Sequence, residues 1–419
     1  MVRGRAGVTH NLPLSGTRLW DSLMEFARIG ATAKGGCNRQ ALTALDGEAR
    51  RLLRRHGAAA GATLTVDRVG NMMLTRPGRD PSRAPVAIGS HLDTQPTGGK
   101  FDGVLGVLAG LEVLRALHEA GVETEAPIAL INWTNEEGAR FSPPMMGSGA
   151  AMGLFEEAEV LAKTDSAGAV FGAELARIGW AGSADPACFQ ALGAYFELHI
   201  EQGPVLEREG LDLGIVTHAL AQHWFDITAT GEDAHGGSGM QGRRDALMAA
   251  AELAVAIERA ALAAGARATI GRMALHPDSR NVVPGKVWFS LDTRHDHESQ
   301  LAALAATIRG EAAGIGARRG VAIEVADFWI SPATPFDSAL VGRLREAARA
   351  RGIAHRDMPT PIGHDAVYVA RKVPAAMLFC PCHGGLSHNE AESITPEWAA
   401  AGLMVLADAV LATAGIAEG

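Results

Sequence analysis

The chain has 419 residues, of which 47% are hydrophobic and 20% are charged, and its formal net charge at pH 7 is -9. Because this length exceeds what one ordinary hydrophobic core accommodates, two globular domains are expected. The negative charge argues against a nucleic-acid partner, which requires a basic surface. The sequence contains no run of about 18 uncharged apolar residues, so no membrane span is expected.

The amino terminus, MVRGRAGVTHNLPLSG, is charged and lacks the apolar stretch of a secretory signal peptide. The four cysteines are too few in a chain of this length to form a disulfide framework. A cytoplasmic protein is therefore expected.

The first half of the chain alternates between strand and helix patterns. Residues 17–60 predict helices, and apolar spacing from 104 to 117 predicts another helix that Gly121 ends. Strands are predicted at 63–66, 72–74, 86–89, 128–133 and 196–200. This order indicates an α/β domain whose mixed, mostly parallel sheet is flanked by helices.

The pattern changes after Gly214 and then follows the order β-α-β-β-α-β. The predicted strands are 224–230, 269–275, 286–294 and about 321–327, and the predicted helices are 245–262 and 298–313. This order is typical of a ferredoxin-like α+β domain. A helix, a strand at 376–379 and a final helix then return to the first domain. The expected domains are therefore 1–213 with 330–419, and an inserted domain at 214–329.

Polar residues gather where the apolar strands end. His91, Asp93 and Asp102 lie in the glycine-rich segment GSHLDTQPTGGKFDG. Strand alternation places His91 and Asp93 on one side, so Asp93 is a candidate partner for the second ring nitrogen of a metal-ligating His91. The alternative is a polar strand end in which Asp102 is the N-cap of the following helix.

Two adjacent glutamates, Glu136 and Glu137, follow the strand at 128–133. Their proximity is electrostatically costly unless a cation neutralises at least one of them. Neighbouring side chains point in different directions, so one can ligate a metal while the other acts as a base on water. A solvated surface pair is the alternative.

Two further histidines complete the candidate set. His199 lies in the strand ELHIE, on the same face as Glu197 and Glu201, and His388 lies in GGLSHNEAE. A lone strand histidine is more often structural, and the nearby CPCH segment offers a thiolate zinc site as an alternative. No second cysteine pair exists to complete such a site. The His and carboxylate set instead suits two divalent metal ions, for which zinc, manganese, cobalt and nickel are all candidates.

The motifs GSHLDTQPTGGKFDGVLG, NWTNEEGARF, ELHIEQGPVLE, GEDAHGG, NVVPG, LDTR, GHDA and GGLSHNEAE extend over nearly the full chain. Together they resemble the aminoacylase/carboxypeptidase-like superfamily of two-metal amidohydrolases. Within it, they resemble the branch of N-carbamoyl-L-amino-acid hydrolases, β-ureidopropionases and allantoate amidohydrolases. The resemblance implies that His91 and His199 hold one metal and that Glu137 and His388 hold the other. It also implies that Asp102 bridges the metals and that Glu136 is the general base.

The resemblance further implies that the inserted domain is a lid and dimerisation domain. His235, in GEDAHGG, would reach the neighbouring subunit's active site and stabilise the oxyanion, whereas without the resemblance it would be read as an ordinary loop residue. Arg294 ends a predicted strand, and its guanidinium is suited to bidentate binding of a substrate carboxylate. The alternative for Arg294 is a surface arginine paired with Asp292.

Other substrate-pocket residues are implied by the resemblance alone. They are Gln202, Asn281, Gly363 and His364. The chain departs from the family pattern just before GHDA, where residues 359–362 read PTPI instead of a small Ser-Gly-Ala run. This departure bears on the pocket next to Gly363 and therefore on the substrate.

The expected activity is metal-dependent hydrolysis of linear carbon–nitrogen bonds outside peptides. N-carbamoyl-L-amino acids or N-carbamoyl-β-alanine are the expected substrates, with amino acid, ammonia and carbon dioxide as products. A homodimer acting on a small ureido acid is implied. Three alternatives remain: an allantoate amidohydrolase, a dipeptidase or aminoacylase of the wider superfamily, and a non-catalytic protein that binds metal and ligand.

Overall fold

The computed structural model describes residues 12–417, so the segment on which the signal-peptide prediction rests lies largely outside the described residues. The chain forms two compact units. The first contains the chain up to Thr217, Pro335–Met358 and the chain from Gly363 onward. The second contains His218–Thr334 and Pro359–Ile362.

The unit boundaries lie a few residues later than the sequence pattern indicated. Strand β6 (Leu213–Ala219) begins at the expected start of the inserted domain, yet its residues Gly214–Val216 pair antiparallel with β15 (Ala375–Cys380). At the other boundary, β12 (Ala322–Ser331) continues past residue 329. The residue pattern of the sequence therefore changes before the domain does. β6 still pairs with the sheet of the first unit, and β12 continues in the sheet of the second unit.

The first unit contains a mixed sheet whose four central strands are parallel. These strands are β4 (Ile128–Trp133), β3 (Val86–His91), β5 (Ala194–Ile200) and β15, in that spatial order, and every residue in them is buried. The outer strands are β1 (Thr63–Val66) and β2 (Met72–Arg76) on one side and β6, β13 (Thr334–Pro335) and β14 (His355–Thr360) on the other. Full burial explains why the central strands read as continuous apolar runs.

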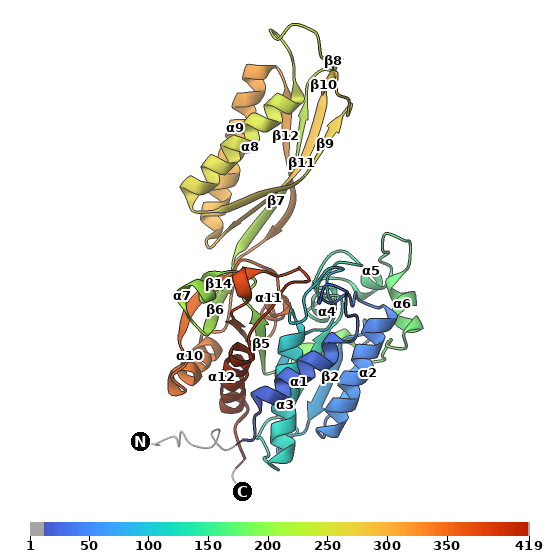
Figure 1. Cartoon of the computed structure of the whole chain (residues 1–419), viewed down its shortest axis with the longest axis vertical. Coiled ribbons are helices and arrows are strands. Elements are labelled where there is room, and N and C mark those ends of the chain that lie inside the picture. The colour runs from blue at the N-terminus through green and yellow to red at the C-terminus, as the bar shows by residue number, and fades with distance from the viewer. Residues whose placement is uncertain (1–11, 418–419) are drawn as a thin grey trace. The chain divides into compact units, whose positions relative to one another are not determined.

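Helices flank this sheet, as the α/β prediction requires. The long ones are α1 (Gly16–Ala27), α2 (Ala44–Ala59), α3 (Val104–Glu119), α10 (Ser338–Ala350) and α12 (Pro396–Ala414). The short ones are α4 (Met146–Ala151), α5 (Glu157–Leu161), α6 (Phe171–Arg177), α7 (Val205–Glu209) and α11 (Asp365–Val369), with 3-10 turns at η2 (Pro186–Ala191) and η3 (His383–Gly385). α1 packs against both α3 and α12 (Figure 1). The mixed α/β class is confirmed.

Helix α3 lies unusually close to the sheet, and this closeness places the loop before it. A Cβ on Gly106 would lie 2.4 Å from the backbone oxygen of Leu198 in β5.

Helix α12 is long and apolar enough to cross a membrane by composition, but 56% of its most apolar window is buried inside the protein. Its Gly402 packs directly on the Leu198 side chain.

The second unit is a four-stranded antiparallel sheet in the order β12–β7–β11–β9, with two helices packed on one face (Figure 1). Its elements are β7 (Ala221–Thr230), α8 (Ala246–Ala264), β9 (Arg267–His276), β11 (Lys286–His295), α9 (Glu298–Arg319) and β12. A short ribbon joins β8 (Ala234–His235) to β10 (Val282–Val283). Phe225, Ile227 and Phe289 face the helices and form part of the core. The β-α-β-β-α-β prediction therefore describes this unit correctly.

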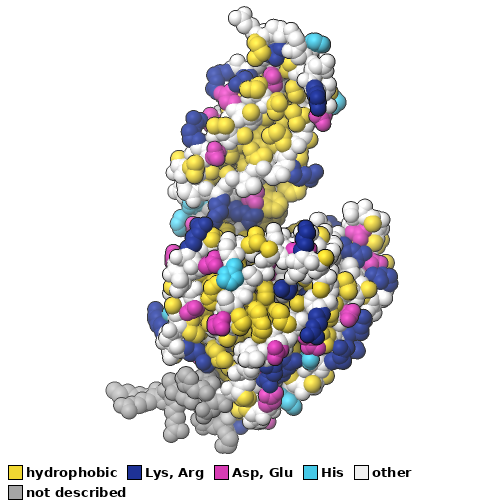
Figure 2. Space-filling view, in the orientation of Figure 1, with side chains coloured by type: hydrophobic (Ala, Val, Ile, Leu, Met, Phe, Trp, Pro, Cys, Tyr) yellow, Lys and Arg dark blue, Asp and Glu magenta, His cyan; other side chains and the backbone are white. Residues whose placement is uncertain are grey.

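Helix α8 also carries an exposed apolar row. Met248, Val255 and Leu262, spaced seven residues apart, are 47%, 63% and 76% exposed. Figure 2 shows hydrophobic side chains gathered over the face of this unit that is turned to the viewer.

Candidate two-metal centre

The candidate site lies at the carboxyl ends of the parallel strands. His91 ends β3 and pairs in register with Trp133 at the end of β4, so the glutamates that follow β4 lie near it. His199 pairs in register with Phe379 of β15, and the loop after β15 carries His388. Open α/β sheets bind ligands at this edge. The topology therefore brings together residues that are almost 300 positions apart in the chain.

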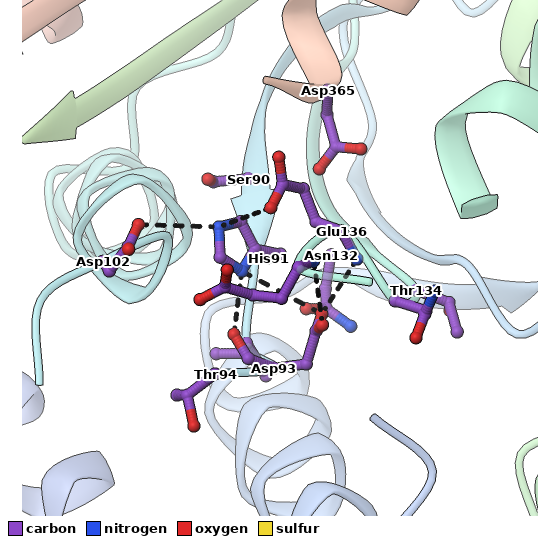
Figure 3. A network of polar contacts seen from close by, with 12 residues as sticks. Ser90, His91, Asp93, Thr94, Asp102, Asn132, Thr134, Glu136 and Asp365 are labelled. Carbon is purple, nitrogen blue, oxygen red and sulfur yellow. Dashed lines mark hydrogen bonds and ion pairs between the residues drawn. The ribbon is translucent and has the colours of Figure 1, made fainter. Parts of the chain in front are cut away.

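The first candidate ligand group consists of His91, Asp102 and His199, whose ligand atoms lie within 4.8 Å of one another. Asp102 Oδ1 is 3.1 Å from His199 Nε2 and 3.9 Å from His91 Nε2. All three side chains are buried. Figure 3 shows the His91 ring between Asp102 and Glu136.

Both histidines have their second ring nitrogen engaged by a backbone carbonyl. His91 Nδ1 is 2.9 Å from the Asp93 oxygen, and His199 Nδ1 is 3.0 Å from the Ile200 oxygen. Because a carbonyl only accepts, Nδ1 carries the proton and Nε2 is left to face the centre. The interpretation of Asp93 as the carboxylate partner of His91 is therefore wrong: the Asp93 carboxylate is 3.9 Å from Nδ1, and the main-chain oxygen makes the contact instead.

The second candidate group consists of Asp102, Glu137 and His388. His388 Nε2 lies 3.2 Å from Glu137 Oε2 and 3.4 Å from Asp102 Oδ2. Gln95 orients Glu137 through its side-chain amide, at 2.8 Å, and its backbone N–H, at 3.2 Å. Gln95 lies within the motif GSHLDTQPTGGKFDGVLG, but the sequence pattern did not predict that it contacts Glu137.

Asp102 belongs to both groups, with one oxygen directed to each. The alternative role of Asp102 as a helix N-cap is wrong, because Gly103 occupies the N-cap position of α3 and no side chain caps that helix end. Gly103 has φ 68°, and a Cβ there would lie 2.3 Å from the His91 ring. Glycine at this position allows Asp102 and His91 to approach each other.

The charges around Asp102 show what the site can hold. Burial alone would raise the pKa of Asp102, but hydrogen bonds from His199 and His388 outweigh it and hold that pKa well below its usual range. Burial likewise opposes protonation of His199, yet the bond to Asp102 raises its pKa to about 9. Hydrogen bonds to Asp102 and Glu137 raise the pKa of His388 to about 10. The carboxylates of this site therefore favour positive charge on the facing imidazoles, and imidazole and carboxylate donors also fit divalent cations.

Glu136 is placed differently from Glu137. Its carboxylate is buried, and Oε2 lies 3.5 Å from His91 Nε2. Burial first, and then the charges of Asp365 and Glu137, raise the pKa of Glu136 well above its usual range. A carboxylate whose pKa is raised in this way is suited to proton transfer. Asn135, with φ 57°, turns the chain so that the two glutamates diverge.

The remaining candidates of the first unit surround the same centre. Gln202 donates to Asp102 Oδ2 at 3.0 Å and to the Ser387 hydroxyl at 3.1 Å. His364 is buried, and its ring meets that of His199 edge to face at 4.4 Å. His364 Nε2 has no hydrogen-bond partner among the described residues. Gly363 packs on Met145, since a Cβ there would lie 2.8 Å from the Met145 methyl group.

Three candidates belong to the second unit. His235, in the short β8 strand, is exposed, and the Gly237 N–H donates to its Nδ1 at 3.0 Å. Asn281 is close to it in the structure, since its backbone oxygen accepts from Gly236 at 2.6 Å. Arg294 pairs with Asp292 and donates to the Pro361 oxygen, so the alternative pairing with Asp292 is present here.

The cysteines do not form a candidate metal site within residues 12–417. None of the ligand groups found there contains a cysteine. Burial raises the pKa of Cys380 and, to about 12, that of Cys382, which disfavours the thiolates that zinc requires. His383 instead contacts Glu207 at 2.9 Å.

Comparison with known proteins places the chain among hydrolases. Residues 87–412 match the family described as peptidase family M20/M25/M40. An N-carbamoyl-L-amino-acid amidohydrolase of Rhizobium meliloti is 48% identical over 411 residues, covering 97% of this chain and 99% of the relative. An allantoate amidohydrolase of Bacillus subtilis is 31% identical, covering 93% and 95%.

The solved structures agree. A hydantoinase/carbamoylase family amidase from Burkholderia multivorans superposes with a TM-score of 0.89 at 47% identity, covering 96% of this chain and 98% of that one. The chain therefore belongs to the M20/M25/M40 peptidase family, in its branch of N-carbamoyl-L-amino-acid and allantoate amidohydrolases, and is a hydrolase of carbon–nitrogen bonds in linear amides.

Proposed function

We propose that this enzyme hydrolyses the ureido carbon–nitrogen bond of N-carbamoyl-L-amino acids or N-carbamoyl-β-alanine. The observation that carries the proposal is the sharing of Asp102 between two ligand groups, with the Glu136 carboxylate 3.5 Å from His91. This arrangement offers two neighbouring cation positions and a base beside them. The 48% identity to an N-carbamoyl-L-amino-acid amidohydrolase supports the substrate class.

In this proposal, His91 and His199 hold one divalent metal, Glu137 and His388 hold the other, and Asp102 serves both. When bound, the metals lower the pKa of water and polarise the substrate carbonyl. The mixed nitrogen and oxygen donors suit zinc, manganese, cobalt or nickel.

Glu136 acts as the base in the proposed reaction. It accepts a proton from the attacking water as the new carbon–oxygen bond forms, and then delivers that proton to the leaving nitrogen. The bond between the ureido carbon and the amino-acid nitrogen breaks. The carbamate that remains decomposes to ammonia and carbon dioxide, and the amino acid is released. Burial of Glu136 keeps competing water away from this proton transfer.

The substrate carboxylate is proposed to bind Arg294 and Asn281. Arg294 already holds the Asp292 carboxylate through Nε and Nη2, so its guanidinium presents the fork geometry that carboxylate binding requires. Gln202, Gly363 and His364 would line the pocket next to the metals. The PTPI segment, whose Pro361 oxygen contacts Arg294, would shape the part that receives the substrate side chain.

We further propose that the second unit is a lid and dimerisation domain. The exposed row of Met248, Val255 and Leu262 on α8 suits association with a second copy of the chain. In such a dimer, the exposed His235 would reach the neighbouring subunit's active site and donate a hydrogen bond to the oxyanion.

Allantoate is the second candidate substrate, favoured by the 31% identity to an allantoate amidohydrolase. The two are separated by measuring ammonia release from N-carbamoyl-β-alanine, several N-carbamoyl-L-amino acids and allantoate with manganese- or zinc-loaded protein. Chelator-sensitive turnover of a carbamoyl compound is the expected result. Selective turnover of allantoate would favour the second candidate, and no ammonia release from any of these compounds by the metal-loaded protein would contradict both.

A further inference from the structure

Glu392 is a buried carboxylate that none of the proposed reaction steps uses. It is 1% exposed and lies four residues after the candidate ligand His388. A buried carboxylate is retained only where hydrogen bonds compensate its lost hydration. The partners of Glu392 therefore indicate what it does.

One oxygen of Glu392 holds the loop that carries Asp102. Oε1 accepts from the Phe101 N–H at 3.0 Å and from the Asp102 N–H at 3.1 Å. These groups are about 290 residues away in the sequence and belong to the turn just before α3. Two N–H bonds to one carboxylate oxygen restrict the backbone of Asp102, the residue common to both ligand groups.

The other oxygen holds the loop that carries His388. Oε2 lies 2.8 Å from the hydroxyl of Ser387, the residue before His388. The same hydroxyl is 3.1 Å from Asp102 Oδ2. Glu392 therefore bonds the backbone at Asp102, and Ser387 joins Glu392 to the side chain of Asp102. Both residues belong to the loop that carries His388.

Glycines on two segments leave room for this connection: Gly99 lies in the loop before Asp102, and Gly36 lies in the separate segment between α1 and α2. A Cβ on Gly99 would lie 2.0 Å from the carboxylate carbon of Glu392, and a Cβ on Gly36 would lie 2.6 Å from the Cα of Glu390. The 387–392 segment thus rests directly on glycine backbone. Any side chain at Gly99 would push Glu392 away from Phe101 and Asp102.

We propose that Glu392 is a positioning residue that fixes Asp102 relative to His388 and so sets the affinity for the metal held by Glu137 and His388. The inference rests on the proposed function, because it requires the two-metal centre. His388 is half exposed, and its ring contacts Glu137 and Asp102, the other members of its ligand group. The metal affinity of the other position, formed by His91 and His199, should depend on Glu392 much less, because backbone carbonyls near their strand ends hold these two rings.

The experiment measures metal per subunit. Wild type and variants are stripped, reloaded with cobalt, passed through gel filtration and analysed for cobalt, and the visible spectrum reports the ligand geometry. Wild type is expected to retain two ions. Glu392→Ala is expected to retain about one, since losing such a supporting contact weakens metal affinity about 10- to 100-fold.

Three further variants make the test specific. Glu392→Gln keeps an acceptor for both N–H groups and a donor for Ser387, so it should retain two ions. Gly99→Ala leaves Glu392 intact but displaces it, so it should lose metal as Glu392→Ala does, and it decides the question if Glu392→Ala does not fold. Glu112→Ala is the matched control, because Glu112 is equally buried but bonds Ser15 and Arg18 instead.

Two ions in Glu392→Ala and Gly99→Ala would overturn the inference, and so would equal loss in Glu112→Ala or in Glu392→Gln. A wild-type protein that retains no metal would instead contradict the proposed function itself.

Discussion

The carboxylate of Asp93, which follows strand β3, accepts the backbone N–H of Glu136, which follows strand β4, at 3.2 Å. Its other oxygen accepts the N–H of Glu137, also at 3.2 Å. One buried carboxylate thereby orients the proposed base and a proposed ligand through their backbone. This relationship links the loops after two adjacent parallel strands.

Asp93→Asn is expected to lower kcat about 10- to 100-fold and to weaken retention of the metal proposed to be held by Glu137 and His388. The asparagine retains one acceptor, but its NH2 group would face the Glu137 N–H and misalign the turn. Asp67→Asn is the control, since Asp67 is also buried and accepts the Val69 and Asn71 N–H groups elsewhere in the same unit. Equal kcat losses in both variants would show that the effect is not specific to this turn.

Glu136→Gln is expected to retain its metals and to lose about a hundredfold to ten-thousandfold in kcat, because the amide cannot accept the proton from water. Metal analysis and steady-state kinetics on the same preparation test this. Loss of metal instead would mean that Glu136 is a ligand and that the roles of the two glutamates are exchanged.

Arg294→Ala is expected mainly to raise KM for carboxylate substrates, by about 10- to 100-fold, because hydrogen bonds between charged groups contribute about 1.5–3 kcal/mol. The comparison is Arg345→Ala, which removes a similar two-pronged arginine–aspartate pair, with Asp357. An unchanged KM in Arg294→Ala would show that Arg294 does not bind the substrate carboxylate and only pairs with Asp292.

Metal loading is expected to release protons near neutral pH. Without metal, the pKa values of about 9 for His199 and about 10 for His388 keep both rings protonated there. A metal must displace these protons, so apparent affinity should rise with pH up to about 9 for the position that uses His199 and up to about 10 for the position that uses His388. Calorimetry in buffers of different ionisation enthalpy should give about two protons per subunit.

The control for proton release is His56→Gln, which removes a histidine that pairs with Glu25 and belongs to neither ligand group. It should leave the number unchanged. Metal uptake without proton release, or affinity that falls as pH rises, would contradict the protonated histidines of the metal-free site.

Much of the fold could be predicted because it depends on local pattern. Buried parallel strands read as apolar runs, and the strand at 128–133 was predicted with the bounds that β4 has. The β-α-β-β-α-β order of the second unit followed from alternating strands and alanine-rich helices. The domain boundaries were less accurate, because β6 reads as the start of a new pattern while its backbone still pairs with β15.

The residue types of the candidate site were visible in the sequence, since histidines and carboxylates follow the apolar strands. The sequence also determined the α/β class, because the period of hydrophobic residues dictates which faces are buried. Only the tertiary structure decided which donors meet: that Asp102 directs one oxygen to each group, that a carbonyl rather than the Asp93 carboxylate holds His91, and that Glu392 joins two distant loops. Such contacts are set by the parallel register of strands far apart in the chain, and no local spacing encodes them.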